Sequence, residues 1–436
     1  MTQNENTNKN ALVIIGALFF VFGFVTWLNG PLITYVKLAF GLDTDSKAFM
    51  VTTSFYMAYF FLALPSSWIL QKTGMKKGMG FALMVMAVGT FIFGQFATHR
   101  NYPMSLLGLF VIGSGLSLLQ TASNPYISIL GPIETAARRI SIVGLCNKVA
   151  GIISPLVISA FVLQGINQLQ QKVNSAPNQL AKDSILNEFA KKIYLPYIIM
   201  SVVLLVIAFL IMKSSLPEIK SSEANKQTET GDGTKEKSSI FNFPHLWLGA
   251  ICIFVYVGAE VMAGDAIGTY GNGFHIPTDE TKYFTSYTLA AMLLGYIIGL
   301  MTIPKYMTQQ VALKYSAVLG MLFTLGAYVT HGYASVAFVA ALGLANALMW
   351  PAIFPMAING LGRFTEKGSA ILIMGIAGGA IIPKAFASLK EHYDFQLVFC
   401  LLMIPCYLYI LYFAVKGYKA GQIKKTRSQG ELQSSR

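Results

Sequence analysis

Charged residues are scarce in this chain, and their scarcity excludes an ordinary soluble protein. Asp, Glu, Lys and Arg make up 12% of the 436 residues, whereas hydrophobic residues make up 54% and the mean hydropathy is +0.57. A typical soluble domain carries roughly 25% charged residues. The hydrophobic residues fall into long blocks, most of which reach the roughly 20 residues that a membrane-spanning helix needs. The sequence therefore predicts a polytopic membrane protein.

Acidic residues are fewer than basic ones, 19 against 32, and the net charge is +13. In a soluble protein this excess would suggest a nucleic-acid partner. Here most of the basic residues lie in loops and in the C-terminal tail, as expected for segments that face an anionic cytoplasmic leaflet. We therefore expect the lipid bilayer as a partner and no nucleic acid.

Cysteine and histidine are also rare, with four and five residues. The cysteines lie inside apolar blocks without metal-ligand spacing, so we interpret them as reduced packing residues. The histidines lie at span ends or in loops, which argues against a histidine proton relay through the membrane. We expect no cofactor other than a coupling ion. The N-terminus lacks the basic region of a signal peptide, so the first span is expected to be retained.

Twelve apolar spans predict an all-α membrane protein with two six-helix bundles. The spans lie near residues 11–38, 47–71, 76–97, 103–129, 139–165, 194–213, 244–270, 281–303, 311–330, 333–358, 367–389 and 394–416. Basic residues concentrate in alternate loops, and the positive-inside rule then places both termini in the cytoplasm. We expect a monomeric, multi-pass protein of a bacterial-type inner membrane.

A polar segment rich in Ser, Lys, Glu and Thr divides the spans into two halves. It predicts an N-terminal six-helix bundle, a flexible cytoplasmic linker, a C-terminal six-helix bundle and a cytoplasmic tail, over residues 1–213, 214–243, 244–416 and 417–436. A weak internal repeat supports this division, because Asn124–Pro125 and Phe354–Pro355 occupy similar places in their spans. Repeats of this kind are typical of transporters, whose binding sites lie near the membrane midplane between the halves.

Polar residues in the fourth and fifth spans mark a candidate pathway, because a polar group in hydrocarbon needs a partner or a wet cavity. Gln120 and Asn124 are four residues apart and share a helix face. Their amides suit a neutral polyhydroxylated ligand, although they could equally join helices. Asn147 and Lys148 lie between glycines in the fifth span. Lys148 is about 13 Å from the cytoplasmic edge and needs a counter-charge or the loss of its proton; a permanent ion pair that locks the bundle is the alternative.

Two further amides lie beside prolines that interrupt their spans. Asn29 follows Thr26 by about one turn and directly precedes Gly30–Pro31. This pattern predicts either that Asn29 lines the pathway or that the helix simply kinks here. Asn346 and Trp350 are four residues apart in the tenth span. Trp350 could stack on the apolar face of a sugar ring or serve in packing alone.

The seventh span carries two acids, Glu260 and Asp265. On a regular helix they would lie about 140° apart, so they can share one site only if the helix unwinds. Five nearby glycines make unwinding easy. A broken helix with two carboxylates and free carbonyls is a plausible sodium site, with Asp265 as a ligand. Alternatively, one acid pairs with Lys148 while the other titrates, and the sequence does not choose between these arrangements.

Several short motifs together resemble the fucose–galactose–glucose symporter family of the major facilitator superfamily. They are FVTWLN, QTASNP, CN, YVGAE and WPAIF with NGLG, and the likeness extends over nearly the whole chain. The resemblance implies two six-helix bundles, alternating access and cation-coupled uptake of a monosaccharide. By position, Gln120, Asn147 and Trp350 match sugar-contacting sites of such permeases.

The chain departs from the proton-coupled fucose permeases at two positions. Those proteins have an Asp directly after Trp-Leu-Asn and a Glu directly before Thr-Ala, where this chain has Gly30 and Gln120. Neither residue can carry a proton, so Glu260, Asp265 and Lys148 remain for cation coupling. The hypothesis is import of a hexose of the glucose, galactose or mannose type with sodium. A proton-coupled fucose or hexose symporter is the first alternative, followed by a drug exporter. A lipid-modifying enzyme would need clustered catalytic groups, and the sequence shows none.

Overall fold

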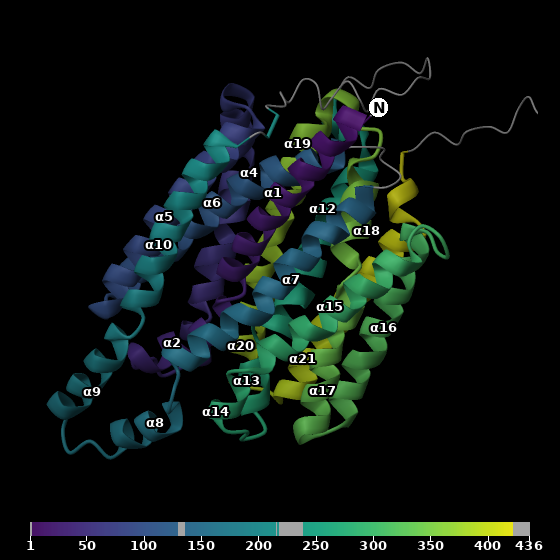
Figure 1. The fold of residues 1–436 in the computed structure, drawn as a ribbon. Coiled ribbons are helices and arrows are strands. Elements are labelled where there is room, and N and C mark those ends of the chain that lie inside the picture. The colour runs from purple at the N-terminus through teal and green to yellow at the C-terminus, as the bar shows by residue number, and fades with distance from the viewer. Residues whose placement is uncertain (1, 130–135, 215, 218–238, 422–436) are drawn as a thin grey trace, which may run out of the picture.

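A computed structural model of the chain describes residues 2–129, 136–214, 216–217 and 239–421. Most of the predicted linker and of the predicted tail therefore lies outside the described residues. Within the described part, twelve helices are long and apolar enough to cross a membrane, and each overlaps one of the twelve predicted spans. The predicted all-α fold with two six-helix bundles is confirmed (Figure 1).

The first bundle is formed by the helices that precede the linker, together with short helices at its edge. They are α1 (Thr2–Thr26), α2 (Asn29–Ala39), α3 (Asp45–Ala48), α4 (Met50–Thr73), α5 (Met75–Thr98), α6 (Tyr102–Ile129), α7 (Ala136–Phe161), α8 (Ile166–Asn174), α9 (Gln179–Lys191) and α10 (Tyr194–Lys213). The short helices α8 and α9 lie between the long helices α7 and α10.

The second bundle follows the linker and has a similar organisation. Its helices are α12 (Pro244–Gly264), α13 (Ile267–Asn272), α14 (Thr278–Thr281), α15 (Phe284–Thr302), α16 (Gln309–Val329), α17 (Gly332–Asn346), α18 (Met349–Ile358), α19 (Thr365–Met374), α20 (Gly378–Leu389) and α21 (Phe395–Val415). The 3₁₀ turn η4 (Gly375–Ala377) joins α19 to α20.

Two spans are interrupted a few residues before a proline, and the proline explains both interruptions. α1 ends at Thr26 and α17 ends at Asn346, in each case five residues before a proline, Pro31 or Pro351. A proline has no N–H to donate and its ring clashes with the carbonyl four residues earlier, so the regular helix stops there. The chain therefore changes direction where α1 meets α2 and where α17 meets α18.

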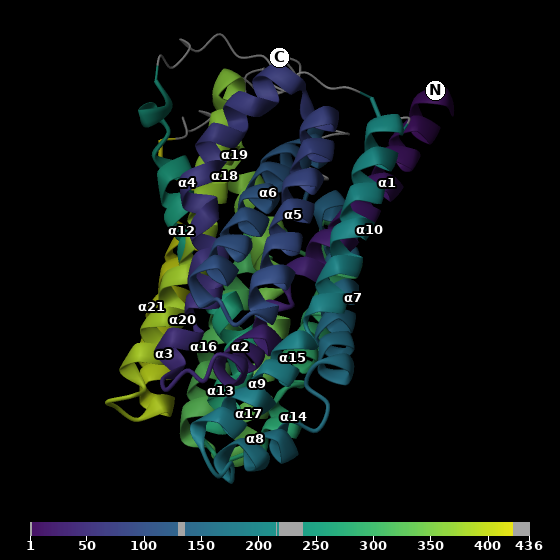
Figure 2. The same ribbon diagram turned by 90° about the vertical axis from the view of Figure 1, so that its left-hand side faces the viewer.

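The spans run side by side, with α1 beginning and α21 ending at one end of the molecule, here called the termini face (Figures 1 and 2). The two bundles meet where α7 packs on α15 and where α4 packs on α19 and α20. Small residues allow helices to approach closely. A Cβ at Gly113 would lie 2.1 Å from the carbonyl oxygen of Phe55, so α4 and α6 pack in this way only with glycine there.

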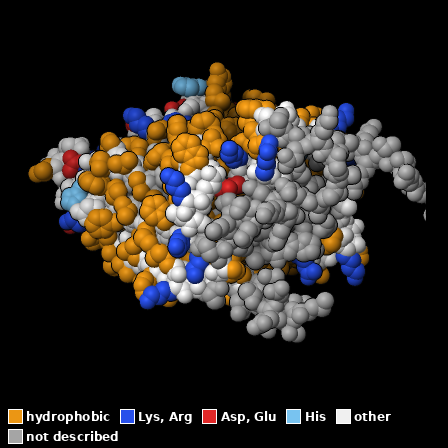
Figure 3. Space-filling view, turned by 90° about the horizontal axis from the view of Figure 1, so that it is seen from above, with side chains coloured by type: hydrophobic (Ala, Val, Ile, Leu, Met, Phe, Trp, Pro, Cys, Tyr) orange, Lys and Arg blue, Asp and Glu red, His pale blue; other side chains and the backbone are white. Residues whose placement is uncertain are grey.

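The flanks of the molecule are apolar, and the termini face is basic. Large hydrophobic side chains are exposed along α10 and elsewhere on the flanks, including Val202, Phe209 and Leu210, as expected for helices in contact with lipid. On the described part of the termini face, Lys and Arg side chains clearly outnumber Asp and Glu (Figure 3).

Candidate functional site

A cavity lies between the two bundles, near the middle of the spans. Its volume is about 80 Å³, which is room for several water molecules, since one water needs roughly 10–15 Å³. Its polar lining residues are Thr26, Gln120, Asn124, Asn147, Lys148 and Glu260. Its aromatic lining residues are Phe19, Phe22, Trp27, Tyr56, Tyr59, Tyr256, Tyr296 and Trp350. The structure therefore brings together six of the nine predicted site residues.

An ion pair crosses the cavity from one bundle to the other. Nζ of Lys148, on α7, lies 2.9 Å from Oε1 of Glu260, on α12, and their side chains are only 7% and 12% exposed. The ammonium also lies 4.4 Å from the ring centroid of Trp27, where the π-face attracts a cation. The partner of Lys148, which the sequence left open, is thus Glu260 in this structure.

The amides of the first bundle are held by aromatic side chains and by the backbone. The Trp27 indole donates to Oδ1 of Asn147 at 3.2 Å, and Nε2 of Gln120 donates to the Tyr59 hydroxyl at 3.0 Å. Nδ2 of Asn124 donates to the backbone carbonyl of Gln120 at 3.1 Å, one turn away on α6. These contacts fix the amides in orientation at the cavity wall.

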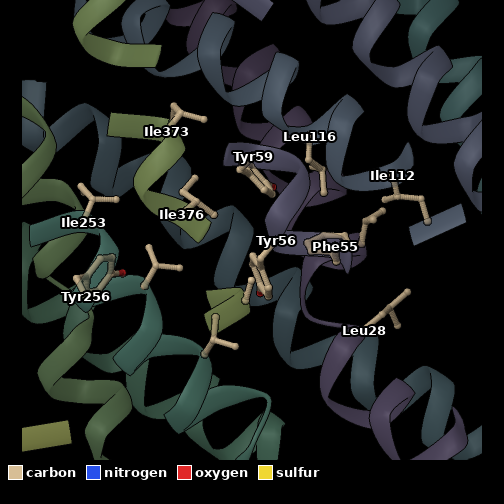
Figure 4. Close-up of a cluster of buried hydrophobic side chains, with 14 of the residues drawn as sticks. Leu28, Phe55, Tyr56, Tyr59, Ile112, Leu116, Ile253, Tyr256, Ile373 and Ile376 are labelled. Atoms are coloured by element: carbon tan, nitrogen blue, oxygen red, sulfur yellow. The ribbon is translucent and has the colours of Figure 1, made fainter. Parts of the chain in front are cut away.

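Aromatic rings form much of the remaining wall. Tyr56 and Tyr59 lie on one face of α4, with ring centroids 6.3 Å apart, and Tyr256 of α12 lies across the site from them (Figure 4). The ring centroid of Trp350 lies 6.4 Å from that of Tyr256, and Trp350 stacks on Phe354 with ring centroids 5.7 Å apart. Apolar ring faces combined with a few oriented amides and charges are the arrangement that recognises a small polyhydroxylated ligand.

Asp265 lies behind the cavity wall rather than in it. It is 2% exposed, and the Tyr56 hydroxyl, which lines the cavity, donates to its Oδ2 at 3.4 Å. Oδ1 has no side-chain hydrogen-bond partner within the described residues and lies against the backbone of Gly30, where an added Cβ would be 3.4 Å from it. No ion pair among the described residues includes Asp265. A buried carboxylate normally has a charged partner, a bound cation or a bound proton.

The two acids of the seventh span do not form a common site. α12 is regular through Gly264 and is interrupted only at Asp265, so Glu260 faces the cavity while Asp265 faces the junction of α1 and α2. The glycines of this span do not unwind the helix between Glu260 and Asp265. The carbonyl of Gly264 accepts a hydrogen bond from the Thr285 hydroxyl at 2.8 Å, so it is not one of the free carbonyls that the broken helix was expected to offer.

Two predicted amides lie outside the cavity lining. Asn29 is 1% exposed at the start of α2. Asn346 is fully buried, and its Oδ1 accepts a hydrogen bond from the Tyr407 hydroxyl at 2.9 Å. Because α17 ends at Asn346, this residue and Trp350 are not one turn apart on a continuous helix, and only Trp350 reaches the cavity.

Polar contacts join the bundles on the face opposite the termini. Oδ2 of Asp45, on α3, lies 2.5 Å from Nζ of Lys390, just after α20. Nζ of Lys384 donates to the Ser46 hydroxyl at 2.6 Å, and the Ser46 N–H donates to Glu391 at 3.0 Å. Lys384 thus connects α20 to α3. These contacts hold the two bundles together at this end.

The main residues that the sequence reasoning missed are aromatic. Trp27, Tyr56, Tyr59, Tyr256 and Tyr296 line the cavity and contact predicted site residues or lie beside them. A signal was available for Tyr56 and Tyr59, which are three residues apart and so share a helix face. Aromatic residues are common in membrane spans, however, and spacing alone does not separate a lining ring from a packing ring.

Comparison with known proteins agrees with this architecture. Residues 15–383 match the family model of the Major Facilitator Superfamily. A glucose/galactose transporter of Brucella abortus (strain 9-941) is 30% identical over 422 residues, which cover 96% of this chain and 97% of that protein. The L-fucose-proton symporter of Escherichia coli K12 is 26% identical, covering 87% and 86%. A crystal structure of FucP in the outward conformation has a TM-score of 0.75 at 22% identity, covering 94% and 98%.

The fold and the central cavity between two six-helix bundles define a polytopic transporter-type membrane protein. The family match and the relatives show that the chain belongs to the Major Facilitator Superfamily, in its fucose–galactose–glucose symporter family.

Proposed function

We propose that this protein imports a hexose of the glucose, galactose or mannose type together with sodium, by alternating access. The observation that carries this proposal is the cavity between the bundles, where oriented amides and aromatic rings surround the Lys148–Glu260 pair. The curated relative from Brucella abortus, described as a glucose/galactose transporter, supports the substrate class. The proposal includes a monomer in a bacterial-type inner membrane with both termini in the cytoplasm, in keeping with the basic termini face (Figure 3).

The proposed sugar site uses both bundles. Gln120, Asn124 and Asn147 offer amide donors and acceptors from the first bundle, and Trp350 offers a ring face from the second. A hexose has hydroxyl groups for the amides and an apolar ring face for the indole. Closure of the two bundles around the sugar would bring these groups together on one ligand.

The proposed sodium site is at Asp265. Its carboxylate is buried and lies between Tyr56 and the backbone of Gly30, without an ion pair among the residues described here. A cation at Oδ1 would remove the cost of this buried charge. Glu260 already has a cationic partner, so its proposed role is to hold Lys148 and contact the sugar rather than to bind sodium.

Sugar uptake into proteoliposomes under an imposed sodium gradient tests the proposal. At equal pH on both sides, an inward sodium gradient is expected to accumulate a hexose above its external concentration. Each ligand is also expected to increase the affinity for the other by the same factor, because the two equilibria are linked. Hexose accumulation that does not depend on the sodium gradient would contradict sodium coupling.

Proton-coupled transport is the second candidate, and one observation favours it. The Escherichia coli relative is described as an L-fucose-proton symporter, and the carboxylate of Asp265 could carry a proton instead of sodium. Accumulation that follows an imposed pH gradient without sodium would support this candidate over sodium symport.

Replacing Trp350 by Ala is expected to raise the KM for the hexose about 10- to 150-fold, because burying an aromatic surface contributes about 1.5–3 kcal/mol. Trp350→Phe retains a ring face, so its KM for the hexose is expected to rise less. Uptake kinetics at saturating sodium measure both effects. Trp247→Ala is a matched control, because Trp247 stacks on Phe241 near the termini face, away from the cavity. Equal KM values for the Trp350→Ala and Trp247→Ala variants would show that Trp350 serves only in packing.

A further inference from the structure

A second hollow lies on the flank of the first bundle, where α1, α7 and α10 run along the same side of the molecule (Figure 2). Its volume is about 770 Å³. Its wall is almost entirely apolar and includes Phe161, Leu195 and Ile199, which are 72%, 64% and 54% exposed. None of the central-cavity residues lines it, so this groove is a separate feature that opens towards lipid.

The groove extends over the depth of one membrane leaflet. Its lining residues on α10 run from Leu195 to Leu204, a rise of about 13 Å. On α1 they run from Phe20 to Val25, and Leu28 lines the groove just beyond the end of this helix. The rise along α10 is nearly half of the hydrocarbon thickness of about 30 Å. The groove therefore begins near the face opposite the termini and ends close to the middle of the spans.

The outer end of the groove is positively charged. Lys191 and Lys192, at the end of α9, line it together with Gln164, and all three side chains are exposed. Neither lysine forms an ion pair within the described parts of the chain. No acidic side chain is among the residues that line the groove. An apolar groove as deep as one membrane leaflet, with two cations at the level of the lipid headgroups, is complementary to an anionic amphiphile.

We propose that this groove binds one anionic glycerophospholipid from the leaflet opposite the termini face. Its phosphate would lie at Lys191 and Lys192, and an acyl chain would lie between α1 and α10. The groove is about five times larger than the roughly 150 Å³ cavity that holds one benzene molecule. It therefore has room for a long acyl chain.

The bound lipid would contact a helix that also forms the central cavity. Leu28 lines the groove and lies at the interruption between α1 and α2. The preceding residue, Trp27, donates a hydrogen bond to Asn147 in the central cavity and lies under Lys148. The acyl chain would thus pack against the segment that holds the Trp27 indole in place.

Lipid titration of the purified full-length protein, followed by native mass spectrometry, tests the proposal without relying on transport. Dioleoyl phosphatidylglycerol is expected to bind its first site roughly thirtyfold more tightly than dioleoyl phosphatidylcholine, about 1 kcal/mol for each of the two lysines. The double variant Lys191→Gln/Lys192→Gln is expected to lose this preference. Lys172→Gln/Lys182→Gln, which changes two lysines that do not line the groove, is expected to keep it.

A second pair of variants tests the apolar part of the groove. Ile199→Trp/Val203→Trp fills the groove and is expected to weaken first-site binding of both lipids at least tenfold. Val202→Trp/Val206→Trp places the same side chains at exposed positions of α10 that do not line the groove, and is expected to bind as the unmodified protein does. Equal affinity for the two lipids, or unchanged binding in the groove-filled variant, would overturn the proposal.

Discussion

Replacing Asp265 by Asn is expected to abolish sodium-driven sugar accumulation while the protein remains folded. The amide has nearly the shape of the carboxylate and can still accept from the Tyr56 hydroxyl, which lies 3.4 Å from Oδ2. It removes the negative charge that would bind the cation. At about 4 Å and an effective dielectric constant of about 20, this charge contributes about 4 kcal/mol, so sodium should bind roughly a thousandfold more weakly. The sodium dependence of uptake in proteoliposomes measures the loss.

The control for this variant is Asp43→Asn. Asp43 is an acid near the face opposite the termini, and its ion pair with Lys47 is mostly exposed, at 69% and 58%. Its neutralisation is expected to leave sodium dependence unchanged, because exposed pairs contribute little. Sugar exchange without any gradient should persist in the Asp265→Asn protein, because Asp265 does not line the central cavity. A normal sodium response of Asp265→Asn would rule out Asp265 as the cation ligand.

The features that could be predicted from sequence are those set by local chemistry. Apolar runs of membrane length predicted every span, and Pro31 marked the interruption of the first one through its missing N–H and its clash with residue 27. Gln120 and Asn124 could be placed on one helix face from their spacing alone. Each of these inferences depends on a few consecutive residues.

The features that could not be predicted depend on how the two bundles meet. Lys148 and Glu260 are 112 positions apart, and no local pattern selects Glu260 rather than Asp265 as the partner. The choice follows from α12 remaining regular through Gly264, which directs Glu260 to α7 and Asp265 to α4. Glycines permit a helix to unwind but do not require it, so their number could not decide the question.

The position of Asn346 also could not be predicted from local sequence. Spacing of four residues from Trp350 predicted a shared face, but that inference assumes a continuous helix. Pro351 stops α17 at Asn346, whose amide contacts Tyr407 of α21, while Trp350 lies on the separate helix α18. The proline was visible in the sequence, whereas the direction in which the chain turns before it depends on how α18 packs against α12 and α16.

Removing one member of the Lys148–Glu260 pair is expected to destabilise the protein by about 3–5 kcal/mol, because it leaves the other charge buried without a partner. Lys148→Met and Glu260→Gln are the two single changes, and both positions are largely buried. The double variant removes both charges and is expected to recover most of the lost stability. Thermal denaturation of the four purified proteins completes the double-mutant cycle.

Recovery of stability without recovery of transport would identify the pair as part of the sugar site. Both side chains line the central cavity from opposite bundles, and hydrogen bonds from charged groups to sugar hydroxyls are stronger than neutral ones. The double variant is therefore expected to recover most of the lost stability and to bind hexose at least tenfold more weakly. Asp43→Asn/Lys47→Met, a change in an exposed pair of the same bundle, should alter neither quantity. Full transport by the Lys148→Met/Glu260→Gln protein would instead show that the pair only holds the two bundles together.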